Sequence, residues 1–318
     1  MNDLKAKILA SRKLSDSSMK SYLGSLRKIK RLTTKNETLD NTDFLRSFDA
    51  VMGVIKKEKS LCSKKNKVTA VLVALGSDKP KDQNLIDKYM MEINSMMSEY
   101  TSFITKQVKT PSQKKNWIDY DEVVKVFENI QKDVRHFKIN RKKVITLKEK
   151  RLLQQLTALH TYMYFPVRCD FCEMKILDIK DFEKLSDEDK QKFNYLIVNK
   201  NKKEFHINQF KNSRYVGGKV FPVPSKLSRT INIWLKHNPS GYYLVQENGV
   251  KPMNSNNLSK FITTIFQERV GKNIGTTLLR HIVVTKDLKG EKTILEKKAI
   301  ADKLMHSPAM SQLYRKVD

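Results

Sequence analysis

The apolar residues of this chain change their spacing part-way along the sequence, and this change limits the folds that the chain can adopt. Up to residue 164 they recur at intervals of three and four, as in 19–29, which places them on one face of an α-helix. Residues 195–198, 204–207 and 219–223 are instead short β-type segments, separated by polar or glycine-containing turns. Helical spacing returns from residue 231 to the end. The sequence therefore predicts a mainly α protein with one small antiparallel β-sheet.

The length of 318 residues suits two hydrophobic cores joined by a linker. Residues 109–116 are polar, contain Pro111 and show no apolar periodicity, which indicates that the linker lies there. We therefore predict an all-helical first domain over 1–108, a linker over 109–116 and a mixed α+β domain over 117–318. Helices are expected from residue 15, where Ser15 or Ser17 is a suitable N-cap, and over 44–56, 68–75, 85–103, 121–134, 152–164, 231–234, 258–266 and from 293 onward.

The charge of the chain points to a large polyanionic partner. Lys and Arg number 62 against 34 Asp and Glu, which gives a formal net charge of +28. Nucleic acid is the first candidate for such a partner, and an anionic membrane is the second. No run of about 18 apolar residues is present, and the first 13 residues lack the apolar core of a signal peptide. We therefore expect a soluble intracellular protein that binds DNA and does not bind a membrane.

The three cysteines are too few for a disulfide framework and suit a reducing compartment. Cys169 and Cys172 have the CxxC spacing, but a structural zinc site needs about four ligands and no second Cys or His pair has matching spacing. We expect two ordinary helical cysteines, and neither a metal nor a cofactor.

Five residues could together carry out phosphoryl transfer on DNA, which needs cations around the phosphate, a proton donor for the leaving oxygen and an aligned nucleophile. They occur in the order Arg168 after a helix, Lys211 in the sheet region, Arg280 on a late helix, then His306 and Tyr314. In this order and context they resemble the tyrosine recombinases, or lambda-type integrases, over about residues 117–318.

The resemblance rests on four local motifs. They read Phe165-Pro166-Val167-Arg168, Gln209-Phe210-Lys211-Asn212, Thr277-Leu278-Leu279-Arg280-His281, and Met305-His306-Ser307 followed by Leu313-Tyr314. The family has a helical, SAM-like core-binding domain and an α+β catalytic domain of the DNA breaking-rejoining type, so the resemblance implies both here.

The resemblance also implies a role for each residue. Tyr314 would attack phosphorus and form a 3′-phosphotyrosyl link, Lys211 would protonate the leaving 5′-oxygen, and His306 would hydrogen-bond the phosphate. Arg168 and Arg280 would grip the non-bridging oxygens, since a guanidinium is permanently charged and forked. Lys219 is the competing lysine.

The chain departs from the family pattern at two positions. Thr277 stands where most members have a His that assists proton transfer, and a hydroxyl cannot exchange a proton near neutral pH. Phe171 replaces an acidic residue, which leaves Asp170 or Glu173 to orient neighbouring side chains, and we favour Asp170. The Leu279-Arg280-His281 motif without a preceding His, and the Arg168-Cys169-Asp170-Phe171 start, resemble integrases of virophages and Polinton-type elements. His281 and Thr277 are therefore supporting candidates.

By resemblance, the partners are double-stranded DNA, three further copies in a tetramer on two DNA sites, and accessory DNA-bending proteins. Candidate DNA contacts in the basic intervals are Lys64, Lys65, Lys67, Lys114 and Lys115, although a lysine run is more often a solvated face. Integration of a viral or mobile element is the expected outcome. The sequence does not distinguish between the cytoplasm, a virus factory and the nucleus of a host cell as the place where the protein acts.

Three other functions stay open. A tyrosine-dependent type I topoisomerase uses nearly the same residues, a DNA-binding protein with a decayed site would explain Thr277, and a metal-dependent nuclease would lose its activity to a chelator.

Overall fold

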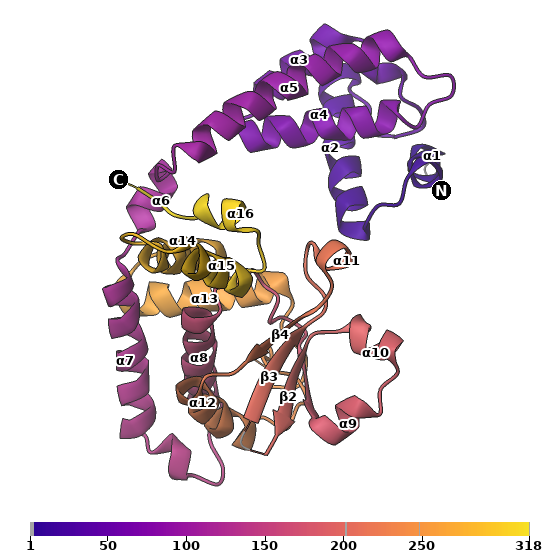
Figure 1. Ribbon diagram of the computed structural model, residues 1–318. Coiled ribbons are helices and arrows are strands. Elements are labelled where there is room, and N and C mark those ends of the chain that lie inside the picture. The colour runs from indigo at the N-terminus through magenta and orange to yellow at the C-terminus, as the bar shows by residue number, and fades with distance from the viewer. Residues whose placement is uncertain (1–2, 201, 248, 318) are drawn as a thin grey trace. The chain divides into compact units, whose positions relative to one another are not determined.

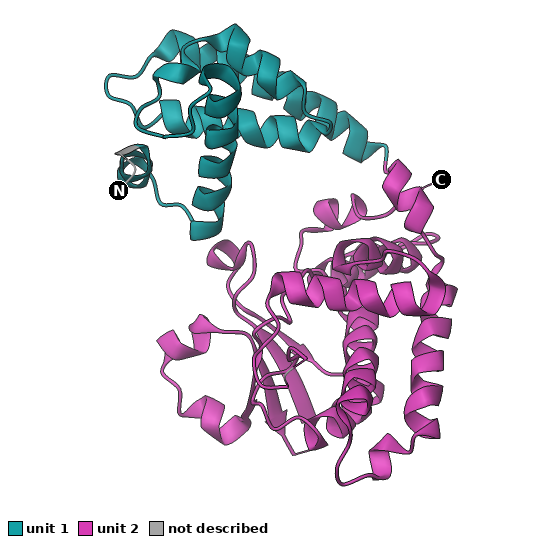
Figure 2. Ribbon diagram, turned by 180° about the vertical axis from the view of Figure 1, so that it is seen from behind, with its two compact units in different colours: residues 1–106 teal, residues 107–318 magenta. Residues whose placement is uncertain are grey.

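The computed structural model describes residues 3–200, 202–247 and 249–317, and the chain divides into two compact units, residues 1–106 and 107–318 (Figure 2). No helix in the described ranges is both long and apolar enough to cross a lipid bilayer.

Helices form the regular secondary structure of the first unit's described residues, as the apolar spacing predicts. Its α-helices are α1 (Asp3–Ser11), α2 (Asp16–Thr34), α3 (Phe48–Lys56), α4 (Leu61–Leu75) and α5 (Gln83–Thr105) (Figure 1). Ser15 caps α2 by accepting a hydrogen bond from the backbone N–H of Ser18 at 3.2 Å, which confirms one of the two predicted caps. Apolar faces such as that of Leu26 and Ile29 on α2 are fully buried in a core of their own.

The second unit combines helices with one sheet. Its longer helices are α7 (Tyr120–His136), α8 (Leu147–Tyr164), α12 (Ser225–Lys236), α13 (Ser255–Val270), α14 (Thr276–Asp287) and α15 (Ile294–Lys303), and its short ones are α6 (Pro111–Asn116), α9 (Ile179–Glu183), α10 (Asp187–Lys192), α11 (Ser213–Val216) and α16 (Pro308–Gln312) (Figure 1). A capping box between Thr146 and Glu149 begins α8 one turn earlier than the apolar spacing predicts.

The sheet contains the three predicted strands and one more. Strands β2 (Tyr195–Asn199), β3 (Lys202–Ile207) and β4 (Lys219–Pro222) pair antiparallel in sequence order. The fourth strand, β1 (Lys175–Asp178), pairs parallel to β2 at the edge of the sheet. The fold class is confirmed, with a parallel edge strand that the sequence analysis missed.

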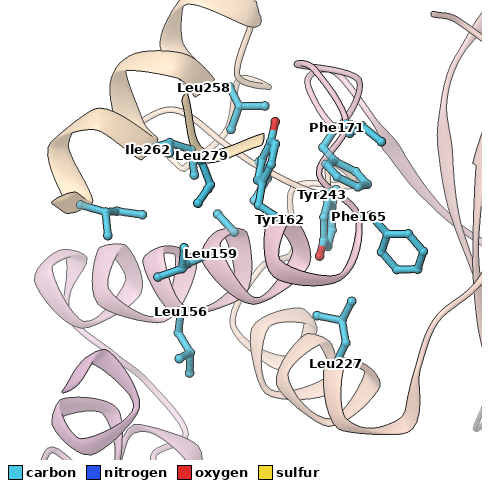
Figure 3. Close-up of a cluster of buried hydrophobic side chains, with 14 of the residues drawn as sticks. Leu156, Leu159, Tyr162, Phe165, Phe171, Leu227, Tyr243, Leu258, Ile262 and Leu279 are labelled. Atoms are coloured by element: carbon cyan, nitrogen blue, oxygen red, sulfur yellow. The ribbon is translucent and has the colours of Figure 1, made fainter. Parts of the chain in front are cut away.

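One continuous core fills the second unit between the sheet and helices α8, α12 and α13. Figure 3 shows Leu159 and Tyr162 of α8 in this core with Leu258 and Ile262 of α13. Phe171 lies in the same core, with its ring centroid 5.1 Å from that of Phe205 and 5.6 Å from that of Tyr162. An acidic side chain at position 171 would be buried among aromatic rings without a partner, which explains why this chain has Phe there.

The segment predicted as a linker contains α6. A capping box between Thr110 and Gln113 starts this helix, and Pro111 occupies its first turn. The boundary between the compact units falls at residues 106 and 107, two residues before the predicted linker. The role of 109–116 as a linker stays a prediction.

His160 makes the stability of the second unit depend on pH. The side chain of His160 is buried, its Nδ1 lies 2.8 Å from Thr230 Oγ1, and burial together with Lys226 lowers its pKa from 6.5 to about 4. A histidine with a lowered folded-state pKa stabilises the fold fully above pH 6.5, and this stabilisation is lost as the pH falls toward 4. Acidification from pH 7 to pH 5 should therefore cost about 2 kcal/mol of unfolding free energy through this residue. Urea unfolding at both pH values should show a smaller loss for His160→Asn, and an equal loss in both proteins would contradict this assignment.

Candidate active site

A cavity of about 680 Å³ brings most of the predicted catalytic residues together in the second unit. Its walls come from the turn after α8, the residues around α10 and β2, the connection from β3 to β4, the start of α14 and the segment after α16. The predicted residues among its lining are Arg168, Asp170, Lys211, Thr277, Arg280 and Tyr314.

The phenol of Tyr314 is surrounded by basic side chains. Arg168 donates a hydrogen bond from Nη2 to the Tyr314 hydroxyl at 3.2 Å, and the Arg280 guanidinium carbon lies 4.5 Å from the Tyr314 ring centroid. The rings of His281 and His306 flank the same phenol, with centroids 5.0 and 5.3 Å away. Residues separated by more than a hundred positions in the sequence thus converge on one tyrosine side chain.

The segment 312–317, here called the tyrosine strap, is fastened to the unit at both ends of Tyr314. Gln107 donates from its side chain to the carbonyl of Gln312 at 2.7 Å, and its own carbonyl accepts from the backbone N–H of Val317 at 3.1 Å. The backbone N–H of Lys316 donates to Thr285 Oγ1 at 2.9 Å. These bonds fix the strap against α14 and the first residue of the second unit.

The side chain of His281 contacts the backbone of the tyrosine strap. Its Nδ1 lies 2.7 Å from the carbonyl oxygen of Tyr314, and because a carbonyl only accepts, Nδ1 must carry the proton of this bond. Burial lowers the pKa of His281 to about 4, so its ring is neutral near pH 7. This supporting residue therefore holds the tyrosine in place as a neutral donor.

Arg280 is a buried cation with unused donors. Its side chain is only 1% exposed, and Nη2 donates to the carbonyl of Leu304 at 2.7 Å. Within the described part of the chain, no acceptor lies within hydrogen-bonding distance of its buried Nε and Nη1. Burial, with repulsion from Arg168, lowers the pKa of Arg280 to about 10, which still leaves it charged at neutral pH. Its free N–H groups suit the oxygens of a bound phosphate.

His306 follows α15 and is neutral at physiological pH. Burial, then the charges of Arg280, Arg168 and Lys211, lower its pKa to about 3. Its buried Nε2 meets no hydrogen-bond partner among the residues that the structure describes. A neutral imidazole can donate one hydrogen bond to a phosphate oxygen, whereas an imidazolium at this position would be repelled by three neighbouring cations.

The structure distinguishes the two candidate lysines. Lys211 is exposed in the connection between β3 and β4 and lines the cavity. Lys219, at the start of β4, forms an ion pair with Asp302 at 2.9 Å. Of the two lysines, Lys211 is the one that lines this cavity.

The two supporting candidates Asp170 and Thr277 also line the cavity. The carboxylate of Asp170 accepts the backbone N–H of Arg168 at 3.0 Å, and burial raises the pKa of this carboxyl. Asp170 therefore shapes the turn that carries Arg168. Thr277 is exposed at the start of α14 and supplies a hydroxyl to the cavity.

The two CxxC cysteines lie in the turn after α8 and not in a helix, which corrects the expectation of helical cysteines. Their thiols face Ser255 and Thr276, and burial raises the pKa of both. Among the described residues, no group of three or more His, Cys, Asp or Glu side chains could hold a metal ion.

The candidate DNA-binding lysines differ in their surroundings. Lys67 is buried on α4 and lies 3.3 Å from Glu58, which also pairs with Lys28, so its ammonium is not presented to solvent. Lys65 lies over the ring of Tyr100, 4.1 Å from the centroid, and Lys64 is half-buried on the same helix. Lys114 and Lys115 are exposed on α6. This leaves four of the five lysines as candidates for DNA contact.

No protein-family model matches the sequence, and no curated protein matches it. Solved structures do match. A lambda integrase dimer bound to a COC′ core site has 15% identity and a TM-score of 0.55, over 98% of this chain and 74% of that one. The XerH site-specific recombinase on palindromic difH has 16% identity and a TM-score of 0.54, over 95% and 77%, and its pre-cleavage complex has 15% and 0.54, over 94% and 76%. The chain therefore has the fold of the tyrosine recombinases.

Because the charge of Arg280 is buried and unpaired, we expect that replacing this residue raises the stability of the protein and weakens anion binding. Because replacing a buried unpaired cation with an apolar side chain removes a desolvation cost larger than the cost of the hydrogen bond lost at the Leu304 carbonyl, Arg280→Met should raise the free energy of unfolding, by about 1 kcal/mol or more. The same variant should lose the stabilisation that bound sulfate gives the unmodified protein.

Thermal unfolding with and without sulfate checks both effects. The matched control is Arg135→Met, which removes an exposed arginine of α7 and keeps the general effect of the salt. A sulfate response in Arg280→Met as large as in the control would show that Arg280 does not bind the anion.

Proposed function

We propose that this protein is a site-specific recombinase that cuts and rejoins double-stranded DNA through Tyr314. The observation that carries the proposal is the 3.2 Å hydrogen bond between Arg168 and the Tyr314 hydroxyl, in a cavity that also contains Arg280 and Lys211. A phenol held among cations is suited to attack an anionic phosphodiester, because the cations can neutralise both the substrate and the charge that develops in the transition state.

The cleavage step breaks one bond and forms one. The Tyr314 oxygen attacks phosphorus, a bond from phosphorus to the tyrosine oxygen forms, and the bond from phosphorus to the 5′-oxygen breaks. The phenolic proton passes to water, Lys211 gives a proton to the 5′-oxygen, and water reprotonates Lys211. Because a phosphodiester replaces a phosphodiester, the reverse steps rejoin the strand without an energy source.

Arg168 and Arg280 would bind the non-bridging oxygens of the phosphate throughout both steps. The free Nε and Nη1 of Arg280 give it two donors for this purpose, while its Nη2 stays bound to Leu304. His306 would add a neutral donor, and His281 would hold the backbone of Tyr314. Since Thr277 cannot act as an acid, Lys211 carries the proton transfer.

The partner that we propose is double-stranded DNA, in line with the charge of +28 and with the DNA-bound lambda integrase and XerH structures of the same fold. The helical first unit would contact the DNA backbone and the second unit the scissile phosphate. A tetramer on two DNA sites, accessory bending proteins, integration of a viral or mobile element and likeness to virophage integrases stay predictions.

A covalent trapping experiment tests the proposal. A nicked suicide substrate should yield a DNA adduct on the peptide that contains Tyr314, detected by denaturing gel and mass spectrometry. Tyr314→Phe should give no adduct, and Lys211→Ala should slow adduct formation about 10²–10⁴-fold, as expected for loss of a general acid. Lys219→Ala, which removes the ion-paired lysine of β4, is the matched control and should retain the adduct.

The same substrate distinguishes the alternatives. Adduct formation that persists in EDTA speaks against a metal-dependent nuclease. Relaxation of supercoiled DNA by the adduct-forming protein without recombination between two sites would favour the topoisomerase. Salt-sensitive DNA binding without an adduct on any DNA end would favour the decayed, DNA-binding protein and overturn our proposal.

A further inference from the structure

Asn194 lies at the cavity wall, immediately before β2, and the mechanism above does not use it. Its side chain is only 6% exposed. A buried amide is costly unless it is hydrogen-bonded, so the partners of this side chain indicate why it is there.

The Asn194 amide makes four hydrogen bonds, which use both of its N–H donors and both lone pairs of its oxygen. Nδ2 donates to the carbonyl of Asp170 at 2.8 Å and to the carbonyl of Gln209 at 2.9 Å. Oδ1 accepts the backbone N–H of Asn208 at 2.8 Å and that of Gln209 at 2.6 Å. Every polar atom of the side chain is therefore satisfied by backbone groups.

These four bonds join two segments that bear charged residues of the site. Asp170 is two residues after Arg168, in the turn that follows α8, and Gln209 is two residues before Lys211, in the connection from β3 to β4. The β3–β4 connection is otherwise largely exposed beyond Gln209, so its position relative to Arg168 depends on contacts at its base.

An asparagine amide can both donate to the two carbonyls and accept from the two backbone N–H groups at these positions. A carboxylate of the same shape would accept from Asn208 and Gln209 but could not donate to the two carbonyls, and a methyl group would make none of the bonds. Leaving a buried carbonyl without its donor also costs free energy, which would loosen the connection.

We infer that Asn194 is a positioning residue, which fixes Lys211 relative to the phosphate that Arg168 holds and thereby sets the rate of proton transfer to the 5′-oxygen. This inference rests on the proposed function, because it concerns the general acid of the cleavage step.

A change of leaving group tests the inference. In a suicide substrate with sulfur in place of the bridging 5′-oxygen, the leaving thiolate needs no proton near neutral pH, since a thiol has a pKa of about 8.5 and an alcohol a far higher one. The measurement is the single-turnover rate of adduct formation on the oxygen and sulfur substrates, together with the ratio of the sulfur rate to the oxygen rate.

Asn194→Ala should slow cleavage of the oxygen substrate about 10–100-fold and raise the sulfur-to-oxygen ratio at least about tenfold, in the direction of Lys211→Ala. Arg168→Ala should slow both substrates and leave the ratio near that of the unmodified protein, because phosphate binding is needed with either leaving group. Asn194→Asp keeps the shape and both accepted bonds, and provides the same test if the alanine variant fails to fold.

The matched control is Asn238→Ala. Asn238 is a buried amide of the same unit that donates to the carbonyl of Tyr242 at 2.7 Å and does not line the cavity. Its loss should lower thermal stability and leave the rate ratio unchanged, which separates positioning from general destabilisation.

Two results would overturn the inference: equal slowing of both substrates by the Asn194 variants, which indicates a purely structural role, or no slowing of either. If the unmodified protein forms no adduct with either substrate, the proposed function itself fails. If the unmodified protein forms the adduct on both substrates, the proposed function holds, and the rates of the Asn194 variants then test the inference alone.

Discussion

The candidate site depends on the contacts made by the buried guanidinium group of Arg280. One of its nitrogens donates a hydrogen bond to the carbonyl of Leu304, and its central carbon lies over the ring of Tyr314. The charge of Arg168 is close enough to lower the pKa of Arg280. Two like charges in a partly dry site are unfavourable in the absence of an anion. A phosphate reverses this balance, because it pairs with both guanidinium groups and relieves their repulsion. The unit thus carries an electrostatic cost that a bound phosphate would offset, which is the arrangement expected of a site organised before its ligand arrives.

The sequence predicted the elements with regular apolar spacing and the residues with a distinctive chemistry. The helical first unit, the strands β2 to β4 and the α14 helix with Arg280 all follow from local patterns. The edge strand β1 was missed because its four residues are partly exposed or exposed and show no β-type run. The sequence could not show that Lys219 pairs with Asp302, because the two residues are 83 positions apart. Asn194 was missed for a related reason: an Asn before a strand is an ordinary turn residue, and its four partners come from two distant turns.

The protonation states of the site explain how it can tolerate Thr277. Both histidines beside Tyr314 have pKa values well below 6.5, so neither provides an acid near neutral pH, and both are suited to donate neutral hydrogen bonds. A histidine at position 277 would line the same cavity as Arg168, Arg280 and Lys211, whose charges would lower its pKa, as burial and these same charges lower that of His306. If Lys211 is the proton donor that we propose, its position matters more, because it lies on an exposed connection and no histidine shares its role.

The attachment of the tyrosine strap also determines the order in which the site can assemble. Gln107 and Gln312, which hold one end of the strap, are 205 residues apart, so their contact closes a loop that spans nearly the whole second unit. Such a contact forms after the core that brings its ends together, because closing a loop of this length in an unfolded chain has a large entropic cost. Its few hydrogen bonds are also among the cheapest to break, since they belong to a short segment at the edge of the fold. We therefore expect Tyr314 to reach its place after the rest of the site, and a local opening of the strap would move Tyr314 while the arginines stay in place.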